Sequence, residues 1–267
     1  MTEPQRASHW SRPDEHFARV GPPMRPPPAA IAAYAAALGP HAGPMLVLGS
    51  TPELATLADD VTAVDRSEAM LARVWPAGDA ARRAVLGEWT ALPFGDATFA
   101  AAACDGGLTC VAWPDGAARV RDELARVLRP RGRAAIRLFA RPERDEAPGD
   151  VLASARARAI GSFHACKWRF ATALASARHD RHVAVREVLE AFDALVADRG
   201  ALARDAGWDA RVIDTIDAYR GSPDVYAFPT VDEAVALWSR AFDVRVVGTG
   251  DYELAERFPL LVLDARG

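Results

Sequence analysis

MLVLGSTPELATLADDVTAVD, residues 45–65, has the pattern of a strand, a tight turn, a helix and a second strand. The apolar run Met45–Leu48 predicts a buried strand, which Gly49 ends. A second apolar run, Val61–Val64, predicts the next strand, and Asp65 follows it directly. This order predicts half of a nucleotide-binding βαβ unit, and therefore a parallel sheet.

The turn between these strands has features of a ligand-binding turn. Ser50 or Thr51 is expected to cap a helix that has Pro52 in its first position, and a helix N-terminus presents backbone N–H groups to a ligand. Asp65 lies 16 residues after Gly49, near the ~20 residues that separate the glycine turn from the ribose-binding acid in dinucleotide sites. Asp65 is therefore expected to accept hydrogen bonds from ribose hydroxyls.

Gly49 is the only glycine of this turn. Since the further glycines of the dinucleotide fingerprint let the backbone approach a pyrophosphate, their absence disfavours NAD and FAD. A nucleoside without phosphates remains possible. The alternative is an ordinary βα unit with an acid at a strand end.

Composition narrows the function classes. The chain has 267 residues, half of them hydrophobic and 25% charged, and a net charge of -4, which is ordinary for a globular protein and gives no electrostatic reason to expect nucleic-acid or membrane binding. Three cysteines without a C-x-x-C pair favour a reducing cytoplasm. No apolar run is long enough for a signal peptide or a membrane span. Lys167 is the only lysine, and the excess of arginine and alanine suggests a GC-rich, bacterial genome.

Strands and helices are expected to alternate along most of the chain, which predicts a mostly parallel, doubly wound α/β sheet covered on both faces. The last two strands lack a crossover helix and are expected to form an antiparallel hairpin. The further strands are predicted at Ala84–Leu86, Thr98–Cys104, Ala134–Ala140, Phe242–Val247 and Leu260–Leu263. The helices are predicted at Ala29–Leu38, after Ser67, at Asp115–Leu128 and from the T-x-x-E capping box at Thr230 to Ala241.

Two segments depart from this alternation. Residues 1–28 are polar and proline-rich, which predicts an extended or disordered arm, but Trp10, His16 and Phe17 leave open that it folds back over the core. Residues 141–229 are expected to form a helical cap above the carboxyl edge of the sheet. Its helices are predicted at Val151–Ala177, Val183–Val196 and Trp208–Tyr219.

His179 and His182 in this segment could share a helix face, but they have no third ligand at a recognisable spacing. A solvated turn is the better interpretation, and no metal site is predicted.

Several segments in this order resemble the class I S-adenosylmethionine-dependent methyltransferases, of the type called type 11. The resemblance covers about residues 30–140 and the C-terminal hairpin, and implies a Rossmann-like seven-stranded sheet in a domain spanning residues 29–267. The segments that carry it are LVLGSTPELATLA, VTAVDRSEAML, GEWTALPFGDATFAAAACD and DELARVLRPRGRAAIRLF. GSTPE replaces the glycine-rich loop of that family, and Arg131 replaces a usual glycine.

The resemblance implies a role for each matching position. Asp65 would bind the ribose hydroxyls, with Arg66 beside it, and Glu88 would accept a hydrogen bond from the adenine amino group, with Trp89 near the ring. The alternative for Glu88 and Trp89 is a strand-end acid and a core aromatic. The positions implied for the methionine end are Gly49, Ser50, Thr51, Asp105 and Gly106, where Asp105 could instead be a turn or cap acid.

The expected function is transfer of a methyl group from S-adenosylmethionine to a small-molecule acceptor, with S-adenosylhomocysteine as product. If the acceptor needs a base, the candidates are Asp105, His164, Tyr219 and Tyr226. The aromatic-rich segment 141–229 is expected to supply the acceptor pocket, and the protein is expected to be a monomer or homodimer. Two alternatives remain: a non-catalytic binding or partner subunit of the same fold, and, disfavoured by the missing glycines, an NAD-dependent oxidoreductase.

Overall fold

The computed structural model describes residues 8–11, 18–76, 80–178 and 180–266. Within these residues, seven strands form one mixed sheet in the order β3-β2-β1-β4-β5-β9-β8. β1 pairs in parallel with β2 on one side and with β4 on the other. This reversal of strand order at β1 opens a crevice at the carboxyl ends of these strands, where α/β folds bind ligands. The strands are β1 (Met45–Leu48), β2 (Val61–Asp65), β3 (Arg82–Leu86), β4 (Phe99–Asp105), β5 (Leu128–Arg137), β8 (Phe242–Val247) and β9 (Leu260–Ala265).

The C-terminal end of the sheet is antiparallel: β9 runs opposite to both β5 and β8. The doubly wound, mostly parallel sheet with a C-terminal hairpin is thus confirmed. β5 begins at Leu128, six residues before the strand predicted at Ala134–Ala140, and its pairing with β4 shifts register near its start.

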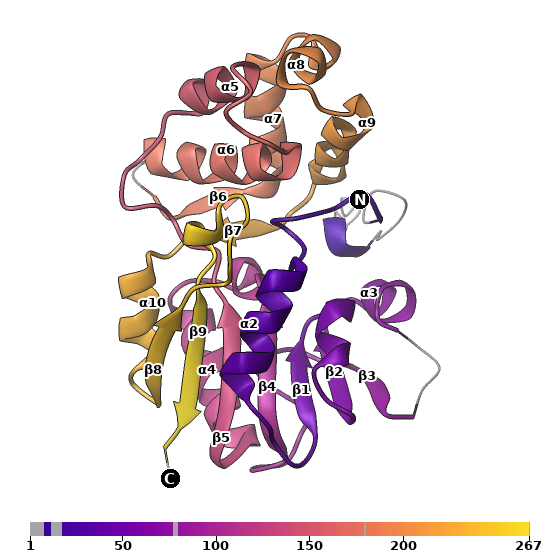
Figure 1. The fold of residues 1–267 in the computed structure, drawn as a ribbon, viewed down its shortest axis with the longest axis vertical. Helices are drawn as coiled ribbons and strands as arrows, with labels where there is room; N and C mark the ends of the chain where they lie inside the picture. The colour runs from indigo at the N-terminus through magenta and orange to yellow at the C-terminus, as the bar shows by residue number, and fades with distance from the viewer. Residues whose placement is uncertain (1–7, 12–17, 77–79, 179, 267) are drawn as a thin grey trace, which may run out of the picture.

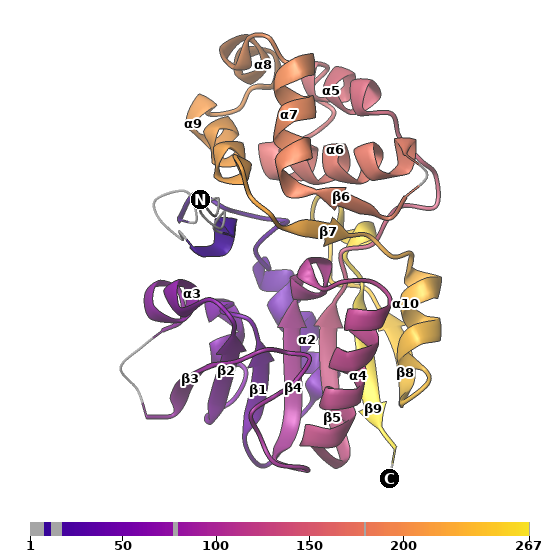
Figure 2. The same cartoon turned by 180° about the vertical axis from the view of Figure 1, so that it is seen from behind.

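Helices cover both faces of the sheet. α2 (Pro28–Leu38) lies on the face seen in Figure 1, whereas α4 (Asp115–Val127) and α10 (Val231–Trp238) lie on the face seen in Figure 2. α4 buries Val120 and Leu124 against the sheet, as its apolar spacing predicts. α10 begins with the predicted capping box, in which Thr230 and Glu233 each bond the other's backbone N–H.

The connection from β1 to β2 differs from the prediction. It holds the five-residue 3₁₀ helix η2 (Pro52–Thr56) in place of an α-helix, and Thr51 makes no side-chain cap bond. Only residues 57–60 separate η2 from β2, which leaves too little chain for a full helix. The next helix, α3 (Glu68–Arg73), is capped by Ser67 as predicted, since its Oγ accepts from the Met70 N–H.

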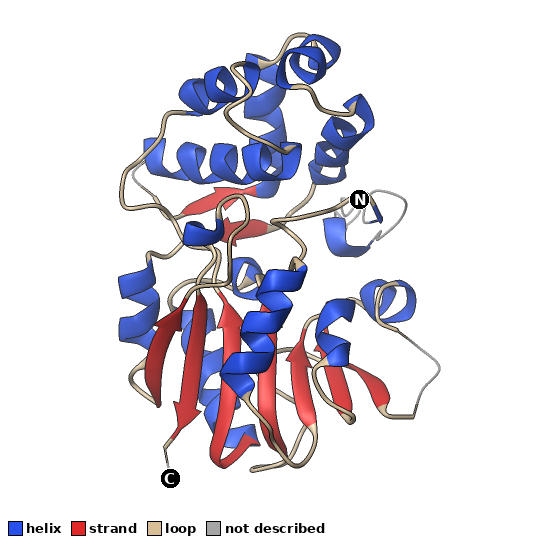
Figure 3. Ribbon diagram, viewed as in Figure 1, coloured by secondary structure: helices blue, strands red, loops and turns tan. Residues whose placement is uncertain are grey.

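The chain between β5 and α10 lies beyond the carboxyl edge of the sheet and is mostly helical (Figure 3). Val151–Ala177, predicted as one helix, is two, because the chain turns at Arg158, which has a positive φ of 59°, and restarts at Ser162, which caps α6. α8 and the two-stranded sheet β6–β7 were not predicted. The elements are α5 (Pro148–Arg156), α6 (Phe163–Ala177), β6 (His182–Ala184), α7 (Val185–Leu195), α8 (Arg199–Ala206), α9 (Ala210–Ile213), the 3₁₀ helix η4 (Asp214–Tyr219) and β7 (Val225–Ala227).

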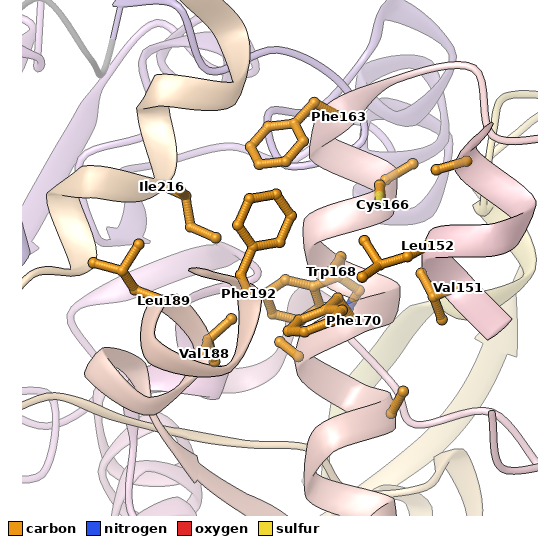
Figure 4. Packing of buried hydrophobic residues seen from close by; sticks show 14 of the residues in the cluster. Val151, Leu152, Phe163, Cys166, Trp168, Phe170, Val188, Leu189, Phe192 and Ile216 are labelled. Carbon is orange, nitrogen blue, oxygen red and sulfur yellow. The ribbon is translucent and has the colours of Figure 1, made fainter. Parts of the chain in front are cut away.

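This segment has its own apolar core, in which Phe163, Trp168 and Phe192 are fully buried (Figure 4). The cluster also includes Phe139, which follows β5, and Phe258, which precedes β9. Two aromatic residues that flank the sheet therefore fix the helical segment onto it. Most aromatics of residues 141–229 are thus core residues.

Three residues singled out from the sequence, His16, Phe17 and His179, lie outside the described residues. His182 forms an exposed pair with Asp180, at 3.0 Å between Nδ1 and Oδ1. No helix among the described residues is long and apolar enough to cross a membrane.

Candidate functional site

A cavity of about 450 Å³ lies at the carboxyl edge of the sheet. Its floor comes from the ends of β1, β2 and β4 and from the turn after β3. This is the crevice at the reversal of strand order described above. Residues that follow these strands, with Met70 of α3 and two residues of α4, also line it; outside the N-terminal arm the lining residues are Leu48, Gly49, Ser50, Thr51, Pro52, Glu53, Asp65, Arg66, Ser67, Met70, Gly87, Glu88, Trp89, Thr90, Asp105, Gly107, Cys110, Val111, Ala112, Gly116 and Arg119.

The turn after β1 requires its glycine. Gly49 has a φ of 97°, which L side chains rarely adopt, and its N–H donates to the Val64 carbonyl at 2.8 Å. Ser50 is buried beside it and donates its hydroxyl to Asp65 Oδ2 at 3.2 Å. The turn and the acid at the end of β2 are thereby held in one wall of the cavity.

Asp65 lines the cavity, and each of its carboxylate oxygens accepts one hydrogen bond from the protein. Its Oδ1 accepts the Ser67 N–H at 2.9 Å. Burial raises the pKa of Asp65, while the hydrogen bonds from Ser67 and Ser50 oppose that shift. A carboxylate placed in this way can accept further hydrogen bonds from a ligand hydroxyl.

Trp89 lies across the floor. Its indole Nε1 donates to the Val64 carbonyl at 2.8 Å. A Cβ at Gly107 would lie 2.6 Å from the indole ring, and one at Gly49 would lie 3.4 Å from it. Gly107 therefore has to be glycine for Trp89 to lie there. Glu88, the preceding residue, is exposed and also lines the cavity.

Asp105 reaches the cavity, but its carboxylate is already paired. Arg137 Nε donates to Oδ1 at 2.6 Å and Arg137 Nη2 to Oδ2 at 2.9 Å, with side-chain exposures of 0% for Arg137 and 2% for Asp105. The Tyr34 hydroxyl lies 3.1 Å from Oδ1. The bidentate guanidinium thus occupies both oxygens of this carboxylate. The geometry therefore does not favour Asp105 as a general base.

Gly106, predicted beside Asp105, does not line the cavity; Gly107 does. Gly106 packs under the Phe139 ring, with which an added Cβ would clash. The position predicted from the sequence is therefore displaced by one residue.

The other three predicted bases do not reach this cavity. His164 Nε2 lies 2.9 Å from the Arg19 carbonyl, and burial lowers the pKa of His164 to about 4. Tyr219 and Tyr226 are buried with their hydroxyls 3.3 Å apart, and burial raises the pKa of both. No described residue of segment 141–229 lines this cavity, contrary to the expectation that the segment supplies the acceptor pocket.

Residues of the N-terminal arm line the cavity instead. The sequence left open whether this arm folds back over the core. Trp10 lies over the cavity, and its carbonyl accepts the Ser67 hydroxyl at 2.9 Å. Figure 1 shows the arm between the helical segment and the β2–α3 side of the sheet. The lining residues from the arm are Ser8, Trp10, Ser11, Val20, Met24, Arg25 and Pro26. Of the three residues that suggested from the sequence that the arm folds back, Trp10 is the one that the structure describes.

A family comparison covers the part of the chain that supplies most of the cavity floor. Residues 48–136 match the family model described as a methyltransferase domain, of type 11. This match contains the turn after β1, the acid after β2 and the strands β3, β4 and β5. Residues 48–136 thus carry a methyltransferase domain. No curated protein matches the chain.

Solved structures support the fold of this methyltransferase domain. An S-adenosylmethionine-dependent methyltransferase of Methanosarcina mazei is 16% identical, with a TM-score of 0.51 over 91% of this chain and 99% of the other. A Rhodobacter sphaeroides protein named as a zinc-dependent alcohol dehydrogenase is 14% identical, with a TM-score of 0.58 over 97% of this chain and 99% of the other. At these identities the likeness concerns the fold alone. Among the described residues, no group of three or more His, Cys, Asp or Glu side chains could hold a metal ion.

Proposed function

We propose that this protein transfers the methyl group of S-adenosylmethionine to a small-molecule acceptor. The observation that carries the proposal is that one cavity collects the turn after β1, Asp65 after β2 and Glu88 after β3. These three positions lie at the ends of adjacent strands, as binding of an extended nucleoside requires. A cavity of about 450 Å³ is within the range of ~300–1,000 Å³ that is usual for small-molecule sites.

The residues of the cavity fit such a nucleoside. Asp65 would accept hydrogen bonds from the ribose hydroxyls, with Arg66 beside it. Glu88 would accept one from the adenine amino group, with Trp89 packed near the ring. The methionine end would lie over Gly49, Ser50, Thr51 and Gly107, where the Asp105 carboxylate, paired with Arg137, is one of the negative charges that line the cavity.

The reaction needs little from the protein beyond positioning. A lone pair of the acceptor forms a bond to the methyl carbon while the carbon–sulfur bond breaks, and its electron pair stays on sulfur as S-adenosylhomocysteine forms. Because the sulfonium charge disappears, alignment of the two reactants supplies much of the rate. Cys110 is the titratable thiol of the cavity, and burial raises its pKa to about 12, which makes it a poor base. We assign no general base, and a proton released by the acceptor passes to solvent.

The acceptor end is proposed under the N-terminal arm. Trp10, Val20, Met24 and Pro26 of the arm face Val111 and Ala112 across the cavity, which favours an acceptor with an apolar body. Neither the lining nor the net charge of -4 favours a nucleic-acid acceptor.

A titration and a transfer assay test this proposal. Calorimetric titrations with S-adenosylmethionine, S-adenosylhomocysteine and NAD are followed by incubation with methyl-labelled S-adenosylmethionine and small-molecule metabolite extracts. We expect binding of the first two, no binding of NAD, and label in a small molecule. Binding without transfer to any extract would favour the non-catalytic alternative, for which the GSTPE turn and the Asp105–Arg137 pair are the supporting observations. Binding of NAD alone would overturn the proposal.

A further inference from the structure

The carboxylate of Asp224 joins three parts of the chain that are distant in sequence. Its Oδ2 accepts from the Ser8 hydroxyl at 2.6 Å, from His9 Nδ1 at 2.7 Å and from the Ser222 hydroxyl at 2.9 Å. Its Oδ1 lies 3.4 Å from Arg66 Nη2. Ser8 and His9 belong to the N-terminal arm, Ser222 to the helical segment and Arg66 to the turn after β2. Only 8% of the Asp224 side chain is exposed.

His9 is held on both sides of its ring. Nδ1 bonds to Asp224, and Nε2 lies 3.0 Å from the Tyr226 hydroxyl. The ring also packs edge-on against Tyr219, with centroids 5.3 Å apart, and 5% of its side chain is exposed. Both ring nitrogens of His9 are thus bonded and its side chain is buried, so specific interactions hold this part of the arm in place.

The residues on either side of His9 are lining residues of the cavity. Ser8 and Trp10 both face it, and Trp10 is also tied to Ser67 through its carbonyl at 2.9 Å. The Ser67 N–H in turn bonds Asp65 Oδ1 at 2.9 Å. One three-residue turn, 65–67, therefore touches the proposed ribose position, the arm and Asp224.

We propose that Asp224 is a positioning residue that docks the segment Ser8–Ser11 as the roof of the acceptor end, and that a nucleoside at Asp65 tightens this docking. The second clause rests on the proposed function. A ligand that orders the turn 65–67 also orders Ser67, which bonds the Trp10 carbonyl of the arm, and Arg66, which lies against Asp224. Occupation of one end of the cavity therefore favours closure of the other. By linkage, an intact roof favours ligand binding to the same extent.

The chain contains a built-in reporter for this docking. Lys167 is its only lysine, it is 4% exposed, and its Nζ lies 5.1 Å from the centroid of the Tyr219 ring. His9 packs against that same ring. Undocking of His9 is therefore expected to uncover the amine of Lys167 to solvent.

The experiment measures the rate at which N-acetoxysuccinimide acetylates Lys167, read by the mass of the peptide that carries it, with and without S-adenosylhomocysteine. In the folded wild type we expect slow labelling that the nucleoside slows several-fold further. Asp224→Asn is expected to label about tenfold faster, with little protection by the nucleoside. His9→Gln should behave in the same way, and the double variant should label no faster than either single one, because both remove the same contact.

Asp180→Asn is the matched control, since it breaks the exposed His182–Asp180 pair of the same segment and should label at the wild-type rate. Thermal unfolding of each variant is recorded first, and His9→Gln replaces Asp224→Asn if the latter does not fold. If Lys167 is labelled at the wild-type rate in both Asp224→Asn and His9→Gln, Asp224 does not dock the arm. Faster labelling of both, with unchanged protection by the nucleoside, would overturn the coupling. A wild type that binds no S-adenosylhomocysteine refutes the proposed function instead, because labelling without ligand still tests the docking.

Discussion

The guanidinium of Arg137 is fully buried and forms two hydrogen bonds with Asp105. Removing one partner of a buried pair leaves the other charge uncompensated, which typically lowers the free energy of unfolding by ~3–5 kcal/mol. We expect an effect of that size for Arg137→Met in urea denaturation. Arg133→Met, which breaks a half-exposed pair with Asp264, should lower it by less than about 1 kcal/mol. Equal effects would show that the burial of the Asp105–Arg137 pair has no special energetic weight.

Lys167 is buried with no countercharge or hydrogen bond to its amine from the described residues, and burial lowers its pKa from 10.5 to about 8. Below pH 8 the amine is charged in both the folded and the unfolded state, and the folded state bears the desolvation cost. Between pH 8 and 10.5 only the unfolded state binds the proton, so stability contributed by this group rises with pH.

Lys167→Met should therefore raise the free energy of unfolding at pH 7 by about 1–3 kcal/mol, the loss of the contact with Tyr219 offsetting part of the gain. The gain should shrink towards pH 10. Urea unfolding of wild type and variant at pH 7 and pH 10 measures this. A less stable variant at pH 7 would mean that the buried ammonium has a stabilising partner.

Some residues of the cavity and its surroundings could be predicted from the sequence, and others could not. Gly49, Asp65 and Glu88 follow apolar strands at short, regular spacing, so a local pattern locates them at one edge of a sheet. The pairing of Asp105 with Arg137 depends on the register of β4 against β5, in which the two are direct partners. His9 and Asp224 are separated by 215 residues, and nothing local to either residue indicates that they meet.

At the scale of elements, α10 offers a test of a predicted feature. The Thr230 hydroxyl accepts the Glu233 N–H at 3.2 Å, and Glu233 Oε2 accepts the Thr230 N–H at 2.9 Å. Loss of an N-cap side chain usually costs ~1 kcal/mol. We expect Thr230→Ala to lower the free energy of unfolding by about that amount, measured by urea denaturation. Ser154→Ala, in an exposed helix interior, should change it by less than about 0.5 kcal/mol, and a Thr230→Ala variant as stable as this control would contradict the role of the cap.

Elements with a strong local signal were predicted correctly, and those fixed by tertiary context were not. Buried strands and the capped helices α3 and α10 follow directly from apolar runs and capping residues. The break between α5 and α6 depends on a positive φ at Arg158, a residue type that does not indicate it. β6 and β7 have three residues each, too few for a periodic pattern, and are defined by their pairing.

For the whole molecule, the sheet carries the proposed nucleoside positions, the helical segment packs on Phe139 and Phe258, and residues of the arm line the cavity. The sequence predicted the first of these arrangements. It assigned the acceptor wall to residues 141–229, because aromatic residues are abundant there. In the structure those aromatics form an internal core, and the arm, which has few of them, lines the cavity.

The central claim is that the cavity at the carboxyl edge of the sheet binds the nucleoside through Asp65. Calorimetric titration of S-adenosylhomocysteine into wild type, Asp65→Ala and Asp60→Ala tests it most directly. Asp60 directly precedes β2 and forms a half-exposed ion pair with Arg83. Hydrogen bonds to a charged group are worth about 1.5–3 kcal/mol, so Asp65→Ala should weaken binding roughly ten- to hundred-fold, while Asp60→Ala stays within about threefold of wild type. An unchanged Kd in a folded Asp65→Ala variant, or a wild type that binds no S-adenosylhomocysteine, would contradict the claim.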